Sequence, residues 1–200
     1  MSVTDKYTTL NTEKIPQVHE AGKHAEYTAL WREITQNGGR TTYQYGFAGY
    51  SWTDVTFNPP ETLRPINARS MFYLSSLTSV SNSQVDFSNA TDMRETFLNS
   101  RDLTSLTLAI GDNNKTFNAN TFGGCEDLTD LTIIGTINDN NFNVQWSENL
   151  THDSLLSVIN ALVDKTGVSG TWTVTLGDVN IAKLTDAEQN IAINKGWWLG

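Results

Sequence analysis

The sequence has very little cysteine and no long apolar run. Cys125 is the only cysteine among 200 residues, so no disulfide can form within the chain. The amino-terminal residues MSVTDKYTTLNTEKIP lack the apolar core that a secretory signal needs. No stretch approaches the roughly 20 apolar residues of a membrane span. We therefore expect a soluble protein, made in a reducing host cytoplasm, without signal peptide or transmembrane segment.

Charge is also scarce. Charged residues make up 18% of the chain, where about 25% is usual, and Asn, Thr and Ser take their place. The formal net charge is −9, and no run of Lys and Arg exceeds two residues. The chain therefore lacks the basic surface that nucleic acid or an anionic membrane would attract, and we expect neither as a partner. Aromatic residues reach 10%, which argues against disorder.

The first of three predicted parts, residues 1–66, combines a helix with strands. Apolar residues from Ile15 to Gln36 recur at three- and four-residue steps, which predicts an amphipathic helix that ends at Asn37-Gly38-Gly39. The segment TTYQYGFAGYSW (residues 41–52) alternates aromatic with small or polar residues, which predicts a strand.

The second part, residues 67–143, contains a repeated phrase. Three segments superpose without gaps at intervals of 25–26 residues: MFYLSSLTSVSN from Met71, FLNSRDLTSLTL from Phe97 and FGGCEDLTDLTI from Phe122. This superposition aligns Met71 with the two phenylalanines. It also aligns Leu74 with Ser100 and Cys125, where a small or medium side chain is expected. The further aligned columns are Leu77, Leu103 and Leu128; Val80, Leu106 and Leu131; and Asn82, Leu108 and Ile133.

Such a period, with L-x-x-L-x-L spacing, is typical of leucine-rich repeats. Alternating leucines point into the core as strand residues, and stacked units share one continuous core. The predicted fold class is α/β: a short leucine-rich-repeat solenoid of about three repeats, with an N-terminal helix plus strands and a C-terminal helix–strand–helix cap, in one compact domain.

The third part, residues 144–200, is expected to be that cap. Residues 151–164 are rich in Leu, Ile and Val and predict a helix, and TWTVTL (residues 171–176) predicts a strand. Thr185 and Glu188 form a capping-box pattern that begins a second helix, and Gly196 stops it.

The phrase F-x-x-C-x-x-L-x-x-L-x-I, complete from Phe122 to Ile133, resembles the BspA-like class of bacterial leucine-rich repeats. The segment from Glu20 to Pro59 is similar to the leader of phage and prophage minor structural proteins of Gram-positive gut bacteria. Residues 150–167 and 171–197 resemble the ending of the same group. The resemblance implies a virion component of the tail, baseplate or fibre, and it supplies no catalytic residues.

Candidate catalytic and metal-binding patterns are weak. HEAGKH, from His19 to His24, has the wrong spacing for a zinc-protease motif, because five residues put the two histidines on different helix faces. The segment from Asp139 lacks the glycine and the glutamate of a calcium loop, so we interpret it as a turn. Cys125 falls in a repeat column, which favours buried packing. His152 has no obvious partner. We expect no enzyme, no cofactor and no metal site.

Aromatic residues are the remaining candidates for binding. They gather in the first part and at the end of the chain, where a ring could stack on a sugar or contact a subunit, although most such rings are core residues. The candidate binding or interface aromatics are Tyr50, Trp52, Trp197 and Trp198.

The expected function is a non-enzymatic structural or binding protein of a virion. It would present its repeat surface to other virion proteins or to a host surface protein or glycan. The alternative is a bacterial surface adhesion or protein-binding module. A carbohydrate-active enzyme is the least favoured function, because none of the candidate catalytic patterns has the residues or the spacing that its chemistry needs. The sequence neither predicts nor excludes a homo-oligomer.

Overall fold

The computed structural model describes residue 57, residues 62–112 and residues 114–200. The predicted helix over 15–36 and strand over 41–52 lie outside these residues. The described part is mixed α/β with small parallel sheets. Among the described residues, no helix is long and apolar enough to cross a membrane. The elements, in chain order, are β1 (Ser79–Val80), β2 (Ser105–Gly111), β3 (Asp130–Gly135), α4 (His152–Ala161), β4 (Trp172–Val174), α5 (Asp178–Ile181), α6 (Asp186–Asn194) and β5 (Trp197–Leu199).

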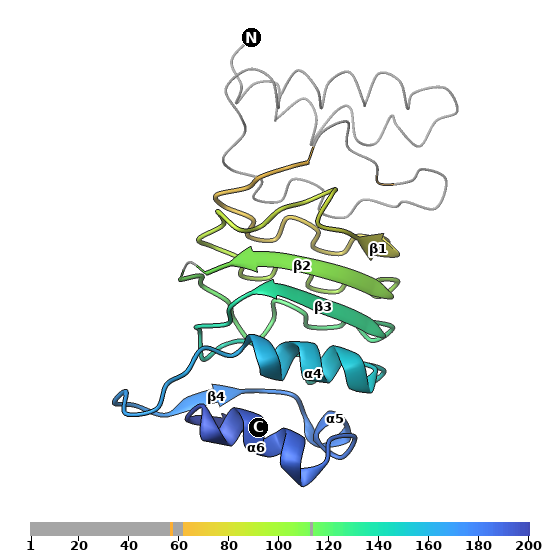
Figure 1. The fold of residues 1–200 in the computed structure, drawn as a ribbon. Coiled ribbons are helices and arrows are strands. Elements are labelled where there is room, and N and C mark those ends of the chain that lie inside the picture. Colours follow the sequence, from red (N-terminus) through yellow and green to blue (C-terminus); the bar gives the residue numbers. More distant parts are fainter. Residues whose placement is uncertain (1–56, 58–61, 113) are drawn as a thin grey trace, which may run out of the picture.

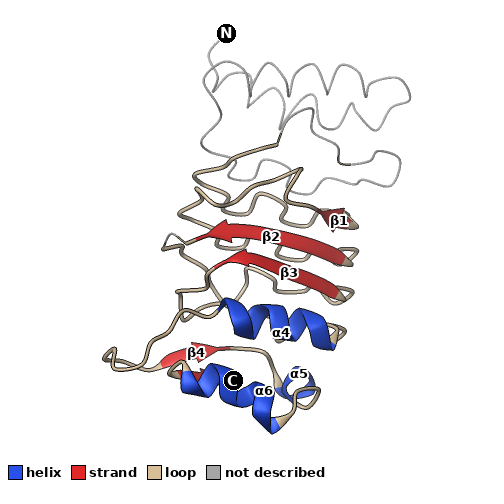
Figure 2. Ribbon diagram, in the orientation of Figure 1, coloured by secondary structure: helices blue, strands red, loops and turns tan. Residues whose placement is uncertain are grey.

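The parallel sheet β1-β2-β3 joins equivalent positions of successive chain turns. Ser79 pairs with Ser105, and Ser105 with Asp130. Outside this sheet, an isolated parallel bridge between Asn67 and Asp92 joins two of the same turns. Each turn therefore lies beside the one before it, and the strands follow one another in sequence order down the molecule (Figures 1 and 2).

A column of phenylalanine rings runs through the core. Phe72 stacks on Phe97 with ring centroids 5.6 Å apart, and Phe97 stacks on Phe122 at 5.7 Å, with the planes within 10° of parallel. All three are fully buried. The expected alignment of Met71 with Phe97 is therefore wrong, because the ring that continues the column is Phe72.

A column of small polar side chains beside these rings is also displaced by one residue from the expected alignment in the first unit. Ser75, not Leu74, faces Ser100, with the two hydroxyl oxygens 3.4 Å apart. Leu74 is 50% exposed and adopts φ 57°, which turns its side chain away from the core. The strands nevertheless keep the expected pairing of Val80 with Leu106. Because the first unit is one residue shorter than the second between its serine and its next leucine, an alignment without gaps cannot match both columns.

Helix α4 covers the free edge of β3. Parallel edge strands expose unpaired N–H groups that invite further strands. Here Leu131 N donates to Ser154 Oγ at 2.8 Å, and Ile133 N donates to Ser157 Oγ at 2.9 Å. The predicted helix from 151 is confirmed but ends earlier, at Ala161. The chain then becomes extended at Leu162, which forms a parallel bridge to Ile137 of the preceding turn.

The carboxy-terminal part contains more elements than expected. The predicted strand is confirmed as β4, and the predicted capping box at Thr185 begins α6. Helix α5 and strand β5 were not predicted. Strand β5 pairs in parallel with β4 through Trp172–Trp197, Thr173–Trp198 and Val174–Leu199.

Candidate functional site

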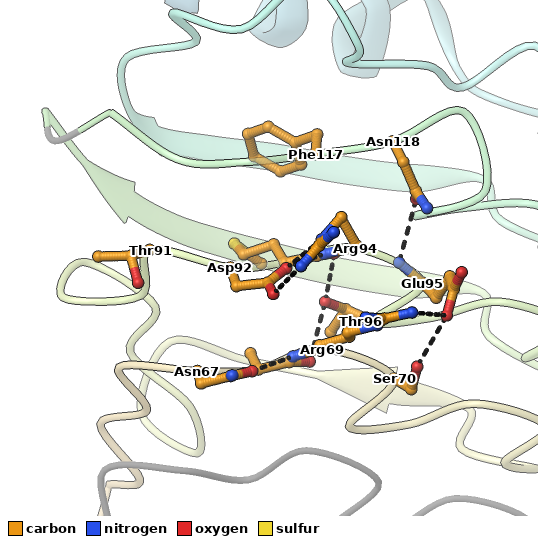
Figure 3. A network of polar contacts seen from close by, with 12 residues as sticks. Asn67, Arg69, Ser70, Thr91, Asp92, Arg94, Glu95, Thr96, Phe117 and Asn118 are labelled. Carbon is orange, nitrogen blue, oxygen red and sulfur yellow. Dashed lines mark hydrogen bonds and ion pairs between the residues drawn. The ribbon is translucent and has the colours of Figure 1, made fainter.

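A network of polar contacts joins three successive turns (Figure 3), and the third turn joins it through Asn118 Oδ1, which accepts a bond from the Glu95 backbone N–H at 3.1 Å. Asp92 accepts two bonds from the Arg94 guanidinium, at 2.9 and 2.7 Å. Glu95 lies 3.7 Å from Arg69 and accepts a bond from Ser70 at 3.1 Å. The hydrogen bond from Arg94 lowers the pKa of Asp92. These contacts hold successive turns together.

Hydroxyl side chains form a second set of contacts between turns. Thr104 Oγ1 donates to Thr78 O, Thr129 Oγ1 donates to Thr104 O, and Ser154 Oγ donates to Thr129 O, each at 3.0 Å. The spacing of the first two bonds along the chain, 26 and 25 residues, matches the turn length. The recurring L-T phrase therefore has a structural role in which each threonine binds the turn before it.

The Cys125 thiol is buried and bonded. Its Sγ donates to Phe97 O at 3.1 Å, and burial raises the pKa of the thiol to about 12. A thiol that stays protonated at neutral pH is a poor nucleophile. The expected packing role is confirmed, with Ser100 making the same kind of bond to Phe72 O at 2.7 Å.

Lys115 is a buried cation that no pattern in the sequence singled out. Its Nζ donates to Ser88 O and Ala90 O of the preceding turn, each at 2.9 Å. Burial lowers its pKa to about 8, against a smaller opposing effect of Asp86. Lys115 is only 5% exposed, so the amine serves to bind backbone carbonyls rather than a ligand.

His152 has a partner, contrary to the sequence-based expectation. Its Nε2 lies 2.9 Å from Glu188 Oε1, and Asp153 is 3.6 Å from its other ring nitrogen. The hydrogen bond with Glu188 raises the pKa of His152. Glu188 also completes the capping box of α6. The pair links the starts of α4 and α6, which the sequence could not show because the two residues are 36 positions apart.

Of the four candidate aromatics, the structure describes two. Tyr50 and Trp52 lie outside the described residues. Trp197 is 2% exposed, and its indole N–H donates to Val163 O at 2.7 Å, so it is a core residue rather than the surface contact expected. Trp198 is 69% exposed on the same strand. Trp146, in a segment that does not match the repeat phrase and that no sequence motif marks, is 54% exposed.

The segment at Asp139 forms a turn. Asp139 Oδ1 accepts from the backbone N–H of Asn141 at 2.7 Å and from its side chain at 2.9 Å. In the part of the chain that the structure describes, no three His, Cys, Asp or Glu side chains come together as a metal site. The two bonds to Asp139 confirm the interpretation of this segment as a turn.

Comparisons with protein-family models, with curated proteins and with solved structures find no match to this chain.

Proposed function

We propose that the chain is a non-enzymatic structural or binding protein of the leucine-rich-repeat solenoid type, acting in the tail, baseplate or fibre of a phage particle. The observation that carries the repeat assignment is the column of Phe72, Phe97 and Phe122, stacked at 5.6 and 5.7 Å. Identical side chains at a fixed interval are what stacked repeat units share as a core.

Two further features support a binding role. The Cys125 thiol is bonded inside the core, and the Asp92 carboxylate is paired with Arg94 at the surface. Solenoids present extended surfaces to protein partners. The particle assignment rests on the resemblance of residues 20–59, 150–167 and 171–197 to phage minor structural proteins.

Mass spectrometry of purified particles, combined with the native mass of the isolated chain, tests this proposal. We expect the chain in particles at a constant ratio to the major tail proteins after a high-salt wash. A chain found only as a free monomer would overturn the particle assignment and favour the bacterial protein-binding module. Hydrolysis of a polysaccharide by the pure protein would overturn the non-enzymatic role.

A further inference from the structure

We draw no further inference here: the strongest candidate, the surface patch formed by the exposed indole of Trp198 on strand β5 in the last described turn, carries nothing, because no contact or charge among the described residues shows what covers it.

Discussion

At the scale of single residues, polar groups that enter the core are bonded to the backbone of the preceding turn. Ser100, Cys125 and Lys115 come from different places in the repeat, yet each donates to carbonyls of the turn before it. An unpaired buried carbonyl costs about 1–3 kcal/mol, so these side chains stabilise the stack by satisfying it. The burial of Cys125 was predictable from its place in a repeat column, whereas the burial of Lys115 was not, because a lone lysine in a sequence carries no sign of burial.

Cys125 should be chemically inert and replaceable by serine. Since Ser100 makes the equivalent bond, Cys125→Ser should lower the free energy of unfolding by less than about 1.5 kcal/mol, whereas Cys125→Leu should lower it by about 1–3 kcal/mol through overpacking. Urea denaturation measures both. Native wild type should react with a thiol reagent only as it unfolds, and rapid labelling of the folded protein would contradict the burial of the thiol.

Lys115 should make the free energy of unfolding rise as the pH rises above 7. Its folded pKa of about 8 lies below the 10.5 of the unfolded chain, so between these values the unfolded state binds a proton that the folded state does not. Stability then increases with pH. Relative to Lys115→Met, the wild type should gain about 2 kcal/mol between pH 7 and 9.5.

The comparison with Lys115→Met removes the opposite effect of Cys125, whose raised pKa makes stability fall above about pH 9 in both proteins. Urea melts across this range provide the measurement. If the difference in the free energy of unfolding between the two proteins does not change with pH, the Lys115 amine is solvated and not buried.

At the scale of elements, α4 takes the place of a strand in the stack. Its two serines occupy the bonding sites that another strand would offer to β3. The helix itself and the capping box of α6 were predictable, because both depend on local spacing of a few residues. Strand β5 and the His152–Glu188 pair were not, because they depend on contacts between distant segments.

Ser154→Ala should lower the free energy of unfolding by about 2 kcal/mol, because it leaves Leu131 N without its buried acceptor. Ser157→Ala is the matched control on the same helix. It should cost less, since Ser157 is partly exposed and water can replace its hydroxyl. Equal losses by thermal or urea unfolding would contradict the edge-capping role.

The link between α4 and α6 should depend on pH. Because Glu188 raises the pKa of His152 in the folded chain, the charged pair stabilises the protein fully below the unfolded value of about 6.5, and this stabilisation is lost as pH rises through the folded value. The Tm of the wild type should exceed that of His152→Asn at pH 5.5 and approach it at pH 8.5. A difference that grows with pH would contradict the assignment.

At the scale of the whole molecule, parallel bridges and side-chain columns arrange turns of about 25 residues in one continuous order. The period and most apolar columns were predictable from the sequence, since Leu106 and Leu131 pair as expected. The register of the first turn was not. It depends on a single missing residue after Ser75, which only the packing of Phe72 on Phe97 makes evident.

Disulfide trapping tests this register most directly. In a Cys125→Ser background, the pair Ser75→Cys and Ser100→Cys should form a disulfide on mild oxidation, because the two hydroxyl oxygens lie 3.4 Å apart on adjacent turns. The pair Leu74→Cys and Ser100→Cys should not, because Leu74 faces outward. Mass spectrometry of the oxidised proteins distinguishes the two. A disulfide in the Leu74 pair and none in the Ser75 pair would contradict the stacked arrangement on which the proposed function depends.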